Sequence, residues 1–149
     1  GADSSYCEEL AAFRSLHVRV SLKGSCESEF TRLTGAKEEG FTLQVDAIRN
    51  LSRARVSCHP AVMCSFSSEE SMRRLYDRIC AIDPELVKDL EVEELIRYPR
   101  VERRLQRFGL RPHISHDPKN VPDRLVWSVE RLQLRHFMDY SFVWWSDRK

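Results

Sequence analysis

The sequence predicts an α/β fold, because candidate β-strands alternate with helical segments along the chain. Parallel strands are expected at about residues 17–23, 56–66 and 90–98. Stretches with apolar residues at helical spacing lie between them. This alternation is typical of βαβ units, which form a parallel sheet with flanking helices.

A short amphipathic helix is predicted first. Ser5 and Glu8 have the spacing of a capping box, and apolar residues then recur at helical intervals to about Ser15.

The clearest strand is HVRVSLKG, in which apolar and polar residues alternate and so face opposite sides of a sheet. The apolar set is Val18, Val20 and Leu22. The polar set is Arg19, Ser21 and Lys23. A parallel strand covered on both faces is almost continuously apolar. We therefore expect the polar set to face the lumen of an open barrel that holds a polar ligand.

Residues 27–35 indicate a short helical turn, and a longer helix is predicted from about Glu38. After the second strand, residues 67–70 are a plausible helix start, and Pro84 is expected to end that helix. The segment from Pro99 to Gly109 has the proline-first, glycine-last pattern of another helix.

Two regions are expected along the chain. Residues 1–110 carry the βα units, and residues 111–149 form a C-terminal extension. This extension begins with a proline-rich loop at 111–123, followed by a helix at about 122–137 and a tryptophan-rich tail.

Composition indicates a folded protein. Of the 149 residues, 42% are hydrophobic and 32% are charged, which is too apolar for a disordered chain. The net charge of +1 provides no overall field for nucleic acid, which is not expected as a partner. No stretch is long and apolar enough to span a membrane, so we expect a soluble, cytoplasmic protein. The five cysteines have no compact spacing, and reduced thiols are predicted.

A ligand site is expected at the carboxyl ends of the strands, where α/β folds bind ligands. Ser21 and Lys23 on the first strand, with Ser65 and Ser67 on the second, could converge there. The alternative is that Lys23 caps a strand end in water and the serines form turns. Spacing alone does not decide between them.

The segments VRVSLKG, EFTRLTGA, EGFTLQVDAIRNL and HPAVMCSFS resemble the middle strands of radical S-adenosylmethionine enzymes, particularly activase-like and uncharacterised archaeal and bacterial members. The resemblance covers roughly residues 10–110. It implies the C-terminal portion of a partial (βα)6 barrel that binds the methionine and ribose of S-adenosylmethionine. Ser21 matches a fourth-strand position that contacts the cofactor, with Lys23 and Arg19 as weaker candidates. HPAVMCSFS, which contains Ser65, matches the fifth strand beside the adenine.

The chain departs from this family in lacking the CxxxCxxC motif that holds a [4Fe–4S] cluster. The glycine-rich GGE-type element of the family's second strand is also missing. We therefore expect a fragment that is inactive alone and completed by a missing N-terminal half-barrel. The parent is expected to cleave S-adenosylmethionine reductively to a 5′-deoxyadenosyl radical, acting on a small-molecule or protein substrate that the sequence does not identify.

Two other functions remain open. Lys23 could be the Schiff-base nucleophile of an aldolase-like barrel. Alternatively, the arginine-rich segment 97–111 could form a non-catalytic module that binds RNA or protein. A metal role for CHPAVMC, residues 58–64, or for His113 and His116 is less favoured, because neither has a complete ligand set.

Overall fold

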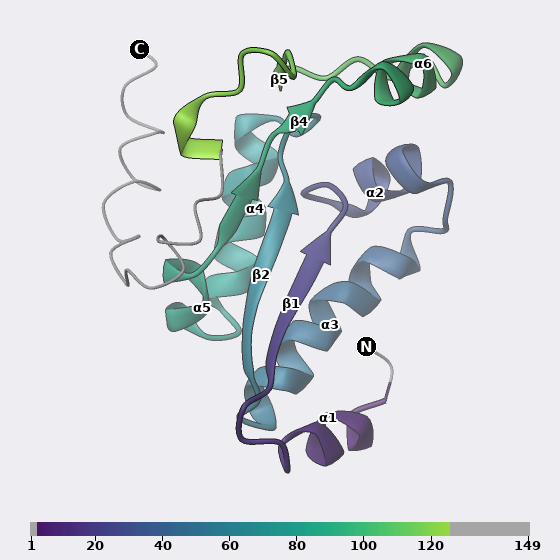
Figure 1. Ribbon diagram of the computed structural model, residues 1–149. Coiled ribbons are helices and arrows are strands. Elements are labelled where there is room, and N and C mark those ends of the chain that lie inside the picture. Colours follow the sequence, from purple (N-terminus) through teal and green to yellow (C-terminus); the bar gives the residue numbers. More distant parts are fainter. Residues whose placement is uncertain (1–2, 126–149) are drawn as a thin grey trace.

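Three parallel strands form the central sheet, in the order β1-β2-β3 (Figure 1). They are β1 (His17–Leu22), β2 (Ser57–Met63) and β3 (Glu91–Glu93). The computed structural model describes residues 3–125. Because the strand order follows the chain order, each βα unit adds its strand beside the preceding one.

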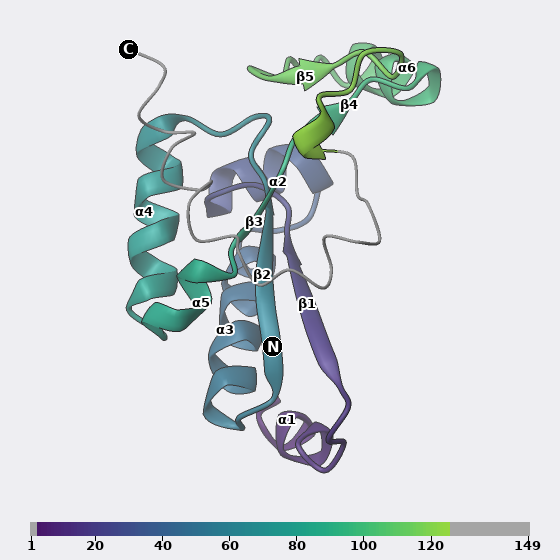
Figure 2. The same cartoon turned by 60° about the vertical axis from the view of Figure 1, so that its left-hand side comes forward.

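The helices that connect these strands pack on one face of the sheet. They are α2 (Glu27–Thr34), α3 (Glu39–Arg53), α4 (Glu69–Cys80) and α5 (Pro84–Lys88). All four contribute buried apolar side chains to the main core, which also contains Leu22 and Val62 from the sheet. Figure 2 shows α3 and α4 together on one side of the strands. The apolar set of β1 therefore packs against helices, as predicted.

A smaller core lies at the amino end of the sheet, beside α1 (Ser5–Leu10). Cys7 of α1 packs there with Leu51 and Val56. The predicted capping box does not form; instead, the Ser5 backbone N–H and hydroxyl both donate to Asp3 Oδ1. The helix is also shorter than predicted.

The region beyond β3 forms an extension at the carboxyl end of the sheet (Figure 1). β4 (Leu95–Ile96) follows β3 after a single residue and pairs in parallel with β5 (Ser115–His116). Between them lies α6 (Pro99–Arg107), which has no buried residues. A 3₁₀ turn, η1 (Asp123–Leu125), ends the described part.

The α/β class and the parallel strands are confirmed, and the sheets are open, without barrel closure among residues 3–125. Three details of the prediction are wrong. The third strand is divided between two sheets, and residues 111–123 include β5. Pro84 begins α5, because Asp83 caps the helix by accepting from the Glu85 N–H. The helix expected at 122–137, apart from η1, and the tryptophan-rich tail lie outside the described residues.

No helix within residues 3–125 combines the length and apolar character needed to cross a membrane.

The start of α3 depends on a glycine. A Cβ on Gly40 would lie 2.6 Å from Cε1 of the buried Phe30 ring. We expect Gly40→Ala to lower the free energy of unfolding by about 1–3 kcal/mol, as overpacking does. In a Phe30→Leu background the same change should be neutral or stabilising, because alanine favours helix over glycine by about 1 kcal/mol. Urea unfolding of the four proteins measures this, and a stabilising Gly40→Ala in the wild type would contradict the clash.

Candidate functional site

The sheet face opposite the helices is polar. Alternation along β1 places His17, Arg19 and Ser21 on this face. The parallel register aligns Arg19 with His59 and Ser21 with Ala61, and it continues from Ala61 to Glu91 and from Met63 to Glu93. Polar side chains of three strands, distant in sequence, are thus brought together.

Arg19 is held by two carboxylates of β3. Its Nε donates to Glu91 Oε2 at 2.7 Å, and its Nη2 donates to Glu93 Oε1 at 2.6 Å. The hydrogen bond to Glu91 raises the pKa of Arg19. Burial alone would raise the pKa of Glu91, but hydrogen bonds from Arg19 and His59 outweigh it and lower this pKa. The predicted cofactor contact Arg19 is therefore already engaged in an ion-pair network.

Two histidines extend this network along the same face. His17 Nε2 lies 2.6 Å from His59 Nδ1, and the two rings stack with centroids 4.9 Å apart. His17 Nδ1 is 2.7 Å from Ser57 Oγ, and His59 Nε2 is 3.3 Å from Glu91 Oε2. This pair was not predicted from the sequence, although His17 shares the polar periodicity of Arg19.

Two buried polar atoms on this face have no hydrogen-bond partner within the described part of the chain. They are Ser21 Oγ and Glu93 Oε2. The Ser21 carbonyl, in contrast, accepts from Gln44 Nε2 at 2.9 Å, which anchors the strand to α3. Buried polar atoms nearly always have partners, so both atoms have hydrogen-bonding capacity left for a ligand or water.

Beyond Ser21, the face leads to a cavity of about 450 Å³ at the carboxyl ends of the strands. Lys23, which is exposed, lines it together with Met63 and Leu95. The end of α2 and the inner side of α6 form the other walls. Lys23 follows directly after β1 and lines this cavity, whereas Ser21 lies on the strand face that leads to it and is not a lining residue.

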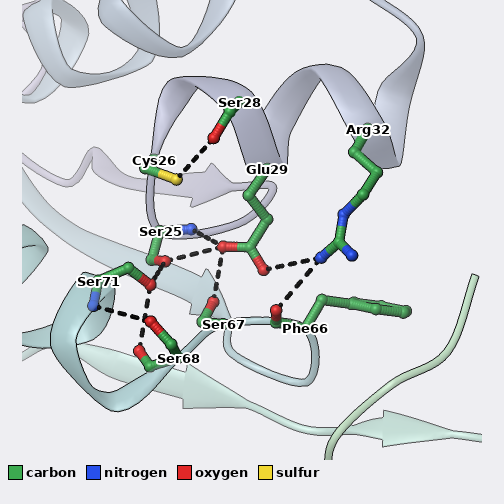
Figure 3. Close-up of polar contacts among 9 residues, drawn as sticks. All are labelled: Ser25, Cys26, Ser28, Glu29, Arg32, Phe66, Ser67, Ser68 and Ser71. Atoms are coloured by element: carbon green, nitrogen blue, oxygen red, sulfur yellow. Dashed lines mark hydrogen bonds and ion pairs between the residues drawn. The ribbon is translucent and has the colours of Figure 1, made fainter.

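A buried carboxylate organises the loops at this end (Figure 3). Glu29 of α2 is only 6% exposed. Its Oε2 accepts hydrogen bonds from the Ser25 N–H and hydroxyl, both at 2.8 Å, and from the Ser67 hydroxyl at 2.9 Å. Gly24, with φ of +101°, allows the close approach, since a Cβ there would lie 2.8 Å from Glu29 Cγ. Glu29 therefore joins the loop after β1 to the loop after β2.

The second oxygen of Glu29 lies near the cavity wall. Glu29 Oε1 has no hydrogen-bond partner in the described residues and lies 3.9 Å from Arg32 Nη2. The same Nη2 donates to the Phe66 carbonyl at 3.3 Å (Figure 3). These contacts hold the Arg32 guanidinium beside the cavity. Glu29 was not predicted as a site residue; its signal in the sequence is that it follows a Gly-Ser turn and that the loop after the next strand is rich in serine.

Ser65 lies apart from the open face. It is fully buried, and its Oγ accepts from the Leu95 N–H at 2.7 Å. Its carbonyl accepts from the His113 N–H at 2.7 Å. Ser65 therefore connects β2 to β4 and β5, while Ser67 is taken up by Glu29. The structure does not bring these two serines to Ser21 and Lys23 as a shared ligand surface.

The cysteines do not form a metal centre. None of the five forms a disulfide, and residues 3–125 contain no group of three His, Cys, Asp or Glu side chains placed to hold an ion. Cys64 is buried, and Cys58 packs against both cores. Burial, followed by the nearby Asp83, raises the pKa of Cys58. His116 is partly buried and pairs with Glu94.

Comparison of the sequence with family models and with curated proteins, and of the fold with solved structures, finds no match.

The Glu29 contacts predict a specific instability. In Glu29→Gln the amide oxygen can replace Oε2, but the three hydrogen bonds to it are then no longer charge-assisted, and the amide NH₂ faces the Arg32 guanidinium in place of a carboxylate oxygen. Hydrogen bonds to charged groups contribute more than neutral ones, so we expect a loss of about 1–3 kcal/mol in the free energy of unfolding, measured with urea. Glu70→Gln is the control, because Glu70 makes only an exposed pair with Arg74. Equal losses in the two variants would contradict a special role for Glu29.

The Arg19 network predicts a pH dependence. The pKa of Glu91 is lower in the folded protein than in the unfolded chain. The stabilising effect of its ionised carboxylate is therefore complete above the unfolded pKa of about 4.3, and it is lost as the pH falls through the lower folded pKa. We expect the stability gap between wild type and Glu91→Gln to be constant from about pH 5 to 8 and to shrink on further acidification. Its size is below about 1 kcal/mol, since Arg19 is 36% exposed.

Urea unfolding at several pH values measures this gap. Arg19→Gln supplies the control background, in which the acid-dependent part should become smaller. A gap that is unchanged in that background would show that the guanidinium is not its cause.

Proposed function

We propose that this chain is the S-adenosylmethionine-binding part of a radical S-adenosylmethionine enzyme. The observation that carries the proposal is the pair of unpartnered buried atoms, Ser21 Oγ and Glu93 Oε2, on an otherwise hydrogen-bonded sheet face. Ser21 is also the residue for which the family resemblance implies a cofactor contact.

The arrangement of the sheet supports a partial barrel. In a (βα) barrel the strands follow chain order and the helices cover only the outer face. Both features occur here, in the order β1-β2-β3 with the core helices on one side. The outer edge of β1 pairs with no strand within residues 3–125. Because exposed edges invite pairing, we propose that a strand of the missing N-terminal half-barrel lies there.

The polar face fits the chemistry of the cofactor. S-adenosylmethionine carries a sulfonium and an ammonium group, and two carboxylates face one guanidinium on this surface. Glu93 Oε2 can accept from an ammonium or a ribose hydroxyl, and the Ser21 hydroxyl can donate to the cofactor carboxylate or ribose oxygen. Arg19 then acts as a positioning residue, because it fixes the Glu93 side chain.

The cysteines of this chain are not placed to hold a [4Fe–4S] cluster together. Cys58 and Cys64 lie at opposite ends of β2, and the other three cysteines lie on α1, before α2 and at the end of α4. We therefore propose that the [4Fe–4S] ligands belong to the remainder of the protein. When bound, S-adenosylmethionine supplies the adenosyl group for radical chemistry in such enzymes. The chain itself binds and orients the cofactor. The intact enzyme would act on a small-molecule or protein substrate in the cytoplasm.

The geometry gives less support to a Schiff-base lysine. Such a lysine needs a desolvated site that lowers its pKa, whereas Lys23 is exposed. The alternative of an RNA- or protein-binding module rests on the arginine-rich α6. This helix is exposed and carries Glu102 among its arginines, which is typical of a solvated helix face.

Cofactor binding is testable in the full-length gene product. Equilibrium dialysis with radiolabelled S-adenosylmethionine should show binding that Ser21→Ala and Glu93→Gln each weaken about tenfold, as expected for loss of a hydrogen bond to a charged group. Ser28→Ala, an exposed serine of α2, is the matched control and should bind as wild type. Thermal unfolding confirms that each variant is folded.

The radical step has its own readout. After anaerobic iron and sulfide reconstitution, reduction with dithionite should release 5′-deoxyadenosine, detected by chromatography. A gene product without CxxxCxxC, or wild-type binding in both variants, would overturn the proposal.

A further inference from the structure

The cavity at the carboxyl ends of the strands has an apolar floor. Met63, Phe66 and Leu95 contribute from the sheet and its loops, and Leu105 and Phe108 from the α6 segment. Its volume of about 450 Å³ is within the usual range of about 300–1,000 Å³ for small-molecule pockets. The floor can therefore enclose an apolar group of a ligand.

The rim of the same cavity is cationic. Lys23, Arg32 and Arg104 line it, and no carboxylate does so among the described residues. Lys23 and Arg104 have no ion-pair partner within residues 3–125, and the carboxylate nearest Arg32 is that of Glu29, at 3.9 Å. Three cations from three separate elements thus surround one opening with little compensating charge. Such an arrangement attracts an anion.

We propose that this cavity binds a small amphipathic anion, with its apolar body on the floor and its carboxylate or phosphate between Lys23 and Arg104. The Glu29 contacts add Arg32 as a third, fixed donor. Anion binding by guanidinium and ammonium groups gives short, charge-assisted hydrogen bonds. The ligand class follows from both halves of the cavity, because neither a purely apolar nor a purely ionic ligand would use the whole of it.

The cavity adjoins the polar face. Lys23 lies two residues beyond Ser21, directly after β1, and Met63, which lines the cavity, is in register with Glu93. The anion would therefore lie next to the proposed cofactor position. Its identification as the substrate rests on the proposed function, whereas the binding itself does not.

Four probes with apolar chains of nine or ten carbon atoms separate the contributions of the head group. Decanoate and decyl phosphate carry the two candidate anions, decanol is neutral, and decyltrimethylammonium is cationic. Isothermal titration calorimetry on the full-length gene product, below the critical micelle concentrations and without reductant or S-adenosylmethionine, measures their affinities. We expect at least one anion to bind about tenfold or more tightly than decanol, and the cation to bind most weakly. The stronger of the two anions identifies the head group.

Substitutions locate the site. Lys23→Gln and Arg104→Gln should each weaken the anionic probe about tenfold and leave decanol unchanged. Arg100→Gln removes the same charge from α6 but does not line the cavity, so it should stay within about twofold of wild type. Arg32 is left intact, because it also holds the Phe66 carbonyl.

Equal binding of decanoate, decyl phosphate and decanol, absence of binding, or an equal loss in Arg100→Gln would each overturn the proposal. Because no cofactor is present, these outcomes are independent of radical activity. Anion binding without 5′-deoxyadenosine release would retain the site and reject only the proposed function.

Discussion

The alternation of apolar and polar residues along β1 is the constraint on which the rest of the structure depends. Val20 and Leu22 face the core, while Arg19 and Ser21 face the opposite side. A shift of the register by one residue would exchange the two faces and place Arg19 among apolar helices without Glu91 and Glu93. The hydrophobic effect therefore fixes the position of the polar network, although none of its members belongs to the core.

At the carboxyl end a single buried carboxylate has the corresponding role. Burying a charge is costly unless hydrogen bonds compensate, and Oε2 of Glu29 receives three of them from two loops. Those loops follow adjacent parallel strands, so the same contacts that satisfy Glu29 fix the relative position of the strand ends. Oε1 is then left to face Arg32. In this way a structural requirement of the loops determines where a cation of the cavity lies.

The sequence was sufficient for the features that depend on local periodicity. β1, α3 and α4 were predicted because each has a regular apolar pattern. Other features depend on contacts between distant segments. β5 consists of two residues whose pairing with β4 is anchored through Ser65, and no local pattern indicates so short a strand. The contact of His17 with His59 spans 42 positions. It requires the register of β1 with β2, which periodicity alone does not provide.

The charges of the site are separated along the strand direction. Over the middle of the sheet, Glu91 and Glu93 exceed the single guanidinium of Arg19. At the carboxyl end, Lys23 and Arg104 have no carboxylate among the described lining residues. Since both surfaces follow one strand face, opposite charges of bound molecules are favoured at different depths. A cationic group is attracted to the sheet and an anionic group to the rim, so the proposed cofactor and the proposed anion would lie at different positions along the strands.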